Sequence, residues 1–146
     1  ILYRAMPKLS PFHLAIPVHN LAKCREFYRD ILGCEEGRSS VHWVDFNFFG
    51  HQLVIHVSDT KHAEDLTNVV DGKEVPIPHF GVVLEMDVFN ELASALNKHN
   101  IIFIIAPYIR VKGLVEEQAT MFFKDPSGNA LEFKAFADRT QLFTNE

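Results

Sequence analysis

The chain has 146 residues, about the size of one domain, and this length is sufficient to bury a substantial core. Hydrophobic residues make up 47% and charged residues 23%, which is typical of a folded globular protein and excludes a disordered one. The net charge of -5 leaves no basic stripe, so neither nucleic acid nor a membrane surface is expected as a partner.

The two cysteines, Cys24 and Cys34, are too few to indicate a disulfide framework. Cys24 falls on the apolar face of a predicted helix, and both are expected to be buried free thiols. The sequence has no signal-peptide pattern and no apolar run as long as a membrane span. We therefore expect a cytoplasmic protein.

Residues 11–57 form the first of two similar halves, predicted as a strand, a helix and then aromatic-rich strands. Residues 12–18 alternate between two faces, as a strand does. The helix is predicted over 21–32, with Asn20 as its N-cap and Gly33 ending it. This order is that of a βαβββ module.

The polar segment 58–77 is predicted to link the two halves. It contains Asp71 and Gly72, which favour a turn, and one weak helical turn is expected at 63–66. We expect the rest of the segment to be irregular.

The second half, residues 78–136, repeats the order of the first. A strand is predicted over 80–85, a helix over 88–98 with Asp87 as its cap, and a second strand over 101–106. Two more strands flank the sequence Asp-Pro-Ser-Gly at 125–128. The repeated order predicts a second βαβββ module.

Residues 11–136 are therefore predicted to form one α+β domain of two modules, with 1–10 and 137–146 as terminal extensions. A single module would leave one face of a small sheet uncovered. Two paired modules can form a cup-shaped, partly closed mixed sheet with the helices outside and a cavity inside. Such a cavity is where a ligand is expected.

Strand alternation places three candidate metal ligands on the inside of this cup: His13, His79 and Glu132. The two histidines occupy equivalent positions of the repeat, and each is followed two residues later by a small residue, Ala15 or Gly81, which would leave room beside a metal. Glu132 lies on the matching face of the last strand, where an unpaired carboxylate would be costly. Each residue alone is more often structural or solvated, but their equivalence across the repeat favours a metal site.

Two imidazoles and one carboxylate leave coordination positions open for substrate, water or dioxygen. We therefore expect one divalent metal ion as the cofactor. Fe(II), Mn(II), Zn(II) and Ni(II) all suit such a site, and the sequence does not choose among them.

Five segments carry a recognisable family pattern: FHLAIPV at 12–18, FYRDILGC at 27–34, FGHQLV at 49–54, PHFGV at 78–82 and FKDPSGNALEF at 123–133. With these segments the sequence resembles the vicinal oxygen chelate superfamily. That superfamily includes glyoxalase I, extradiol ring-cleaving dioxygenases, fosfomycin-resistance proteins and bleomycin-binding proteins. The match spans about residues 11–136 and is specific for the fold but weak for the reaction.

The resemblance implies that His13, His79 and Glu132 are the metal ligands. Glyoxalase I commonly adds a glutamate on the last strand of the first module, where this sequence has Val54. The resulting three-ligand site is closer to that of the dioxygenases. Those enzymes usually carry a tyrosine ten residues before the ligand glutamate, and this sequence has Phe122 there, which we predict to contact the substrate.

Two further histidines are predicted to be catalytic. His56 lies on the same face as Val54, two residues further on, and is a candidate fourth ligand or proton shuttle because imidazole titrates near neutral pH. His51 has the opposite parity and is the weaker candidate. For either residue the alternative is an ordinary exposed or hydrogen-bonded histidine.

Other residues are predicted to bind the substrate. Arg110 and Lys112 lie in the segment 108–118, which is expected to be an irregular loop able to close over the cavity. Arg110 would suit an anionic substrate, whereas Lys112 is more typical of a solvated surface. Trp43 is predicted to form an aromatic wall with its phenylalanine neighbours, although core packing is an equally good interpretation.

The leading hypothesis is a metal-dependent enzyme of dioxygenase type that acts on a small substrate, anionic or aromatic, through vicinal oxygens. A glyoxalase-like lyase or isomerase is one alternative. Another is a metal-free protein that binds a small aromatic molecule, as bleomycin-resistance proteins do. The resemblance also makes a homodimer possible, because dimers are common in this superfamily.

Overall fold

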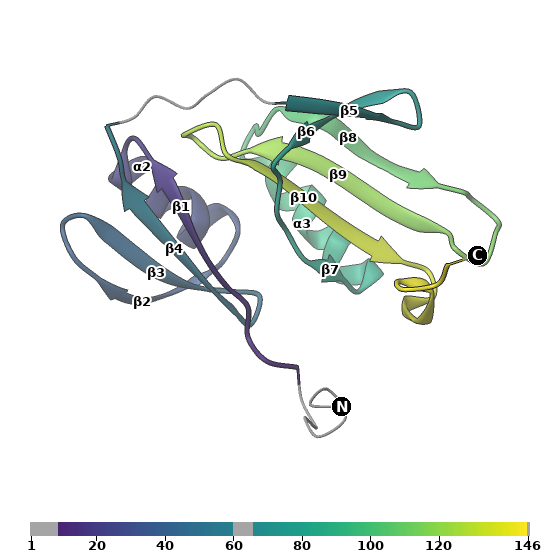
Figure 1. The fold of residues 1–146 in the computed structure, drawn as a ribbon, viewed down its shortest axis with the longest axis horizontal. Coiled ribbons are helices and arrows are strands. Elements are labelled where there is room, and N and C mark those ends of the chain that lie inside the picture. Colours follow the sequence, from purple (N-terminus) through teal and green to yellow (C-terminus); the bar gives the residue numbers. More distant parts are fainter. Residues whose placement is uncertain (1–8, 60–65, 146) are drawn as a thin grey trace.

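The computed structural model describes residues 9–59 and 66–145 and contains two modules side by side (Figure 1). Module 1 consists of β1 (His13–Val18), α2 (Leu21–Glu26), the π-helical segment η1 (Phe27–Ile31), β2 (Glu35–Ser39), β3 (Trp43–Phe48) and β4 (His51–Val57). Its sheet has the order β1-β4-β3-β2, in which β1 is parallel to β4 and the other neighbours are antiparallel. The predicted βαβββ order is confirmed for this module.

The first helix begins where the sequence predicts. The Asn20 side chain accepts a hydrogen bond from the Lys23 amide at 3.0 Å, and the helical turns run on through η1 to a left-handed Gly33. Both cysteines are buried free thiols, as predicted. In the described ranges 9–59 and 66–145, no helix is both long and apolar enough to cross a membrane.

Module 2 consists of β7 (Val83–Leu84), α3 (Met86–Lys98), β8 (Phe103–Arg110), β9 (Gln118–Lys124) and β10 (Ala130–Phe136), followed by the short helix η2 (Arg139–Gln141). Its sheet has the order β7-β10-β9-β8, which repeats that of module 1. Both four-stranded sheets are mixed, and they do not close into a barrel. The α+β fold of two modules is therefore confirmed.

Several predicted boundaries in module 2 are wrong. Helix α3 begins at Met86, with Glu85 in the N-cap position, so Asp87 lies in the first turn instead of capping it. The strand predicted over 80–85 is regular only at β7. Before β7 the chain makes a single bridge from Phe80 to β10.

Strand β8 extends to Arg110, so Tyr108 and Arg110 lie in a strand and not in the irregular loop predicted for 108–118. Pro107 interrupts the apolar pattern of this strand and conceals its length in the sequence. A proline is tolerated there because β8 is an edge strand, where one side of the backbone needs no partner.

Residues 66–77 form a hairpin, although the sequence predicted an irregular linker. β5 (Leu66–Val70) pairs antiparallel with β6 (Lys73–Ile77). Asp71 and Gly72 form the turn with φ values of 52° and 74°, the combination that favours an Asp-Gly pair in a two-residue hairpin loop. Residues 63–65 of the predicted helical turn, and residues 1–8 of the predicted N-terminal extension, lie outside the described residues.

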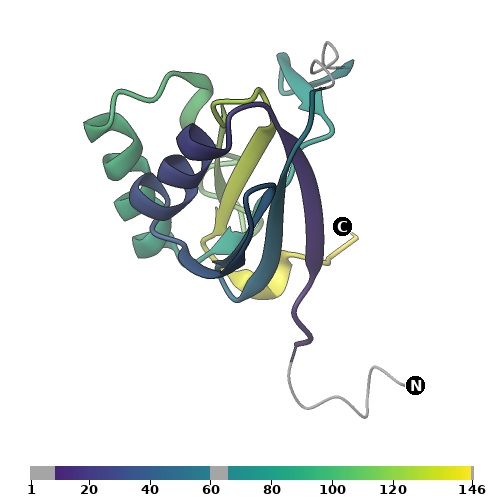
Figure 2. The same ribbon diagram turned by 90° about the vertical axis from the view of Figure 1, so that its left-hand side faces the viewer.

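One hydrophobic core joins the two modules. The sheet face opposite His13 carries Phe48, and the face opposite Glu132 carries Phe123 and Phe133. The ring centroids of Phe48 and Phe133 are 5.9 Å apart. Both helices lie on this side of the sheets (Figure 2). The faces that carry the candidate ligands therefore point away from the shared core.

A buried polar network also links the modules. Asp125, which is 4% exposed, accepts hydrogen bonds from the Tyr28 hydroxyl at 2.8 Å and from the Asn129 side-chain amide at 2.9 Å. The same amide donates to the Pro17 carbonyl in β1 at 2.8 Å. These bonds fix β1 relative to β10, because Asn129 immediately precedes β10.

Candidate metal centre

His79 and Glu132 form a contact on the outer face of the module 2 sheet. His79 Nε2 lies 3.0 Å from Glu132 Oε1, and the two side chains are 30% and 13% exposed. Thr120 donates a hydrogen bond to the other carboxylate oxygen, Oε2, at 2.6 Å. The second imidazole nitrogen of His79, Nδ1, lies 2.7 Å from the Pro76 carbonyl in β6. Since that carbonyl can only accept, Nδ1 is the donor.

The electrostatics of this pair favour the charged forms. Hydrogen bonding to Glu132 raises the pKa of His79, against the effect of burial. Burial alone would raise the pKa of Glu132, but the hydrogen bonds from His79 and Thr120 outweigh it and hold that pKa below its ordinary value. Positively charged Lys134 acts in the same direction on Glu132. The pair is thus an ionised carboxylate beside an imidazole that favours its protonated form.

Gly81 allows the backbone beside His79 to approach β10 closely. A Cβ atom at this position would lie 1.5 Å from the Glu132 carbonyl oxygen. The sequence suggested that a small residue here leaves room for a metal. In the structure the small residue is needed because the Glu132 backbone lies against residue 81, and only glycine leaves enough space for it.

His13 lies apart from this pair, on the exposed outer face of module 1. Its Nδ1 lies 2.8 Å from Gln52 Oε1, and the Gln52 amide nitrogen lies 3.4 Å from Asp45 Oδ2. Within residues 9–59 and 66–145, no three His, Cys, Asp or Glu side chains lie close enough together to hold a metal. The structure thus brings two of the three predicted ligands, His79 and Glu132, together. The third, His13, lies apart from them on module 1.

The other predicted site residues of module 1 lie on two different faces of its sheet. His56 pairs with Trp43 across β4 and β3, so both lie on the same face as His13. The neighbouring residues Phe46, Phe48 and Phe49 pack into the shared core, so they do not form the predicted aromatic wall with Trp43. The ring of His51 is engaged at the start of β4, where its Nδ1 accepts a hydrogen bond from the Phe12 amide at 2.8 Å.

Phe122 and Arg110 both lie on the Glu132 side of the module 2 sheet. Phe122 is 3% exposed, and its ring makes an edge contact with His79, with centroids 5.1 Å apart. The β5–β6 hairpin covers it through Val75. Arg110 Nε lies 2.6 Å from the carboxylate of Asp71, at the tip of that hairpin.

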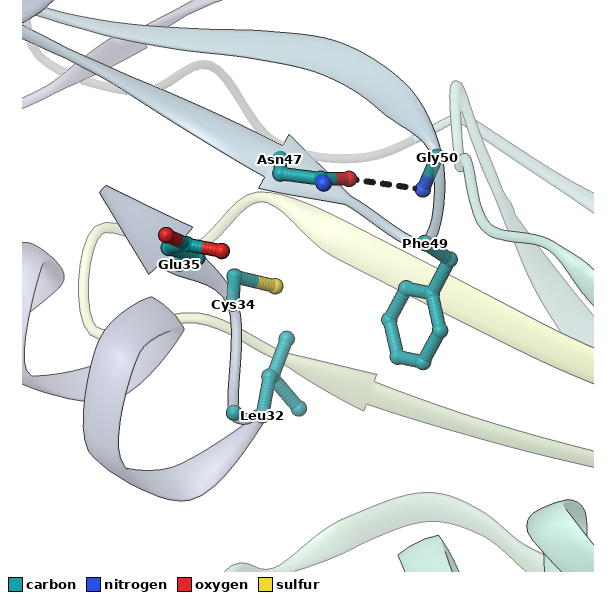
Figure 3. A pocket seen from close by; sticks show the side chains of 7 residues that line it. Leu32, Cys34, Glu35, Asn47, Phe49 and Gly50 are labelled. Carbon is teal, nitrogen blue, oxygen red and sulfur yellow. Dashed lines mark hydrogen bonds between the residues drawn. The ribbon is translucent and has the colours of Figure 1, made fainter. Parts of the chain in front are cut away.

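Several hollows surround these elements. A hollow of about 350 Å³ is lined by Ala15, Pro17, His79 and Ala130, where β1 meets the chain before β7. Another, of about 320 Å³, lies between Cys34 and Phe49 at the end of module 1 (Figure 3). It lacks all the predicted ligands.

Cys34 does not make the hollow of Figure 3 a reactive site. Burial raises the pKa of Cys34 to about 12, so its thiol is not a nucleophile at neutral pH. Of the hollows described, the one beside His79 is therefore the one with metal-binding chemistry in its wall.

The donor atoms of the three predicted ligands suit a divalent ion. Two ligands about 2.0–2.1 Å from one tetrahedral ion lie roughly 3.3 Å apart, so the 3.0 Å separation of His79 Nε2 and Glu132 Oε1 needs only a small shift. Both histidines use Nδ1 to reach a carbonyl oxygen, from Pro76 or Gln52. That arrangement is typical of metal-bound histidines and directs Nε2 to the ion.

Sequence reasoning did not find the supporting residues Thr120, Pro76 and Gln52. Thr120 and Gln52 neighbour the ligands across strands, so strand register is needed to place them. The position of the Pro76 carbonyl beside His79 depends on the β5–β6 hairpin, which was not predicted from the sequence. The one available signal was Asp71-Gly72 between β-branched residues, which favours a hairpin.

A family model described as the Glyoxalase/Bleomycin resistance protein/Dioxygenase superfamily matches residues 10–133. A glyoxalase/bleomycin resistance protein/dioxygenase from Alicyclobacillus acidocaldarius is 34% identical, with a TM-score of 0.77 over 94% of this chain and 100% of that chain. The fosfomycin resistance protein FosX from Listeria monocytogenes shares the fold, with 18% identity and a TM-score of 0.67 over 95% of this chain and 99% of that chain. A comparison with curated proteins finds no match. The chain belongs to the glyoxalase/bleomycin resistance protein/dioxygenase superfamily.

Proposed function

We propose that this protein is a metal-dependent enzyme that acts on a small substrate through two neighbouring oxygens, in a dioxygenase-like reaction. The contact between His79 Nε2 and Glu132 Oε1 carries the proposal, because each partner is also fixed by a second hydrogen bond. In this proposal His79, Glu132 and His13 hold one divalent ion. A 2-His-1-carboxylate set with open positions suits Fe(II).

A bound divalent ion would act as a Lewis acid toward charge that develops on the two substrate oxygens. The protein residues orient the ligands and shape the surroundings. Thr120 and Pro76 hold Glu132 and His79 in their orientations. Phe122 excludes water from one side of His79. His56 is the proposed acid–base group, since it is exposed on the His13 face and an imidazole can both donate and accept a proton.

We also propose that a second copy of the chain supplies His13. Within one chain the described residues do not bring His13 to the His79–Glu132 pair, and the outer faces of both modules point away from the shared core. In this proposal the His13 face of one copy meets the Glu132 face of another and completes the site. A two-fold dimer would form two such sites at once.

Metal content tests the proposal. Protein purified without oxygen should contain one divalent ion per chain by elemental analysis, and His79→Ala and Glu132→Gln should lose it while keeping a native circular dichroism spectrum. Glu91→Gln, on the exposed side of α3, is the matched control and should retain the ion. If His79→Ala keeps a full complement of metal, the ligand assignment is refuted.

Reaction type is tested separately. Oxygen uptake with a panel of catechols should be metal-dependent, and turnover of a glutathione hemithioacetal would instead identify a glyoxalase-like isomerase. If wild type binds aromatic ligands equally well with and without metal, and turns none of them over, the protein sequesters its ligand and is not an enzyme.

A further inference from the structure

The outer face of the module 2 sheet carries three rows of side chains, each row crossing the strands. Strand register places Glu132 opposite Phe122 in the first row. The second row is Lys134, Thr120 and Tyr108, and the third contains Gln118 and Arg110. Residues in register on neighbouring strands project from the same face. Polar and cationic groups therefore lie directly beside the proposed metal ligands.

Lys134 is the nearest cation to the His79–Glu132 pair along β10. It follows Glu132 by two residues on the same face of the strand, and it lies opposite Thr120, which donates a hydrogen bond to Glu132. Lys134 is half-buried, and within the described ranges no hydrogen bond or ion pair is found for its ammonium group. A partly desolvated ammonium is stabilised by nearby anions, and a bound oxyanion can act on Lys134 together with the Glu132 carboxylate.

Tyr108 and Arg110 already converge on one anion, which belongs to the protein. The Asp71 carboxylate oxygen Oδ2 accepts from Arg110 Nε at 2.6 Å and from the Tyr108 hydroxyl at 3.1 Å. Asp71 reaches them from the turn of the β5–β6 hairpin and is exposed. Exposed ion pairs of this kind contribute little stability, so another anion can replace Asp71 at small cost.

We propose that Lys134, Tyr108 and Arg110 form an anion subsite beside the metal centre, and that the substrate carries a carboxylate or similar oxyanion in addition to its two metal-binding oxygens. In the structure Asp71 occupies part of this subsite. This inference rests on the proposed function, since it names the substrate class of the same site. Tyr108 and Arg110 would donate to the oxyanion as they now donate to Asp71, and Lys134 would bind it from the side nearer Glu132.

The test measures binding by calorimetry on the full chain loaded with redox-inert Zn(II). The probes are catechol, which has vicinal oxygens only, and 2,3- and 3,4-dihydroxybenzoate, which add a carboxylate. Wild type should bind at least one dihydroxybenzoate about tenfold more tightly than catechol, the effect expected for charged hydrogen bonds. Lys134→Gln should abolish this preference, measured within each variant as the ratio of dihydroxybenzoate to catechol affinity, whereas Lys134→Arg should preserve it.

Two further variants complete the experiment. Asp71→Asn removes the internal anion and should tighten dihydroxybenzoate binding several-fold without affecting catechol. Lys98→Gln, at the end of α3, is the matched control and should behave as wild type. The subsite is overturned if wild type shows no preference, or if Lys134→Gln keeps it. If catechol binding itself does not require Zn(II), the proposed function fails instead, so the two failures are distinguishable.

Discussion

The two modules have the same topology but present their candidate ligands differently. In module 2, His79 and Glu132 touch, and the β5–β6 hairpin covers their neighbourhood. In module 1, His13 is exposed, and its Nδ1 lies 2.8 Å from the side-chain oxygen of Gln52. The comparison shows that module 2 brings two of the proposed metal ligands into contact, whereas module 1 holds the third apart from them.

The sequence difference behind this asymmetry lies on the strand next to each histidine. In β4, Val54 and His56 occupy the positions that Glu132 and Lys134 occupy in β10. Valine has no donor atom, so module 1 cannot form a two-ligand pair of its own. The same fold therefore places two proposed ligands side by side in module 2 and one in module 1.

The largest effect is expected where module 2 is most crowded. Gly81→Ala would place a Cβ atom 1.5 Å from a backbone oxygen, so we expect a loss of at least about 3 kcal/mol in the free energy of unfolding. Ala15 is the equivalent residue of module 1, and Ala15→Gly should cost only about 0.5–1 kcal/mol. Urea unfolding measures both. Equal losses in the two variants would show that the modules are packed alike at this position.

A smaller effect is expected at Gln52, which orients His13. Gln52→Leu removes the acceptor of Nδ1 and should weaken metal binding about 10–100-fold, the usual effect of losing such a partner. Gln52→Glu keeps an acceptor oxygen and should bind nearly as wild type. Competition with a chelating dye gives both affinities. Unchanged affinity in Gln52→Leu would mean that His13 needs no orientation.

The smallest effect is expected at Thr120. Thr120→Val keeps the shape of the side chain but removes the hydrogen bond to Glu132 Oε2. Because His79 still holds the carboxylate, metal affinity should fall only about tenfold. The same dye competition measures it. A loss as large as that of Glu132→Gln would indicate that module 2 is less preassembled than the structure suggests.

Sequence reasoning was most successful where a signal is local. The α2 helix cap at Asn20 and the strand faces of His13 and Glu132 follow from neighbouring residues alone. The length of β8 could not be predicted because Pro107 breaks its pattern, and only its edge position makes proline acceptable.

The assembly of the site was beyond the sequence for a different reason. Alternation fixes which face of a strand a residue occupies, but not how two sheets are oriented relative to each other. Phe48 and Phe133 pack together in one core, and this packing turns the ligand faces outward. The packing of these rings and the direction of the ligand faces both depend on contacts between segments far apart in the sequence. A local sequence pattern does not predict such contacts.

The central claim is that His13 of one copy completes the His79–Glu132 half-site of another. The most direct test purifies a heterodimer of a His13→Ala chain and a His79→Ala chain, carrying different affinity tags, and measures its metal content. The account predicts that neither variant binds metal alone and that the heterodimer binds one ion, because one of its two sites has all three ligands. A heterodimer without metal, beside a wild-type dimer that binds two ions, would contradict it.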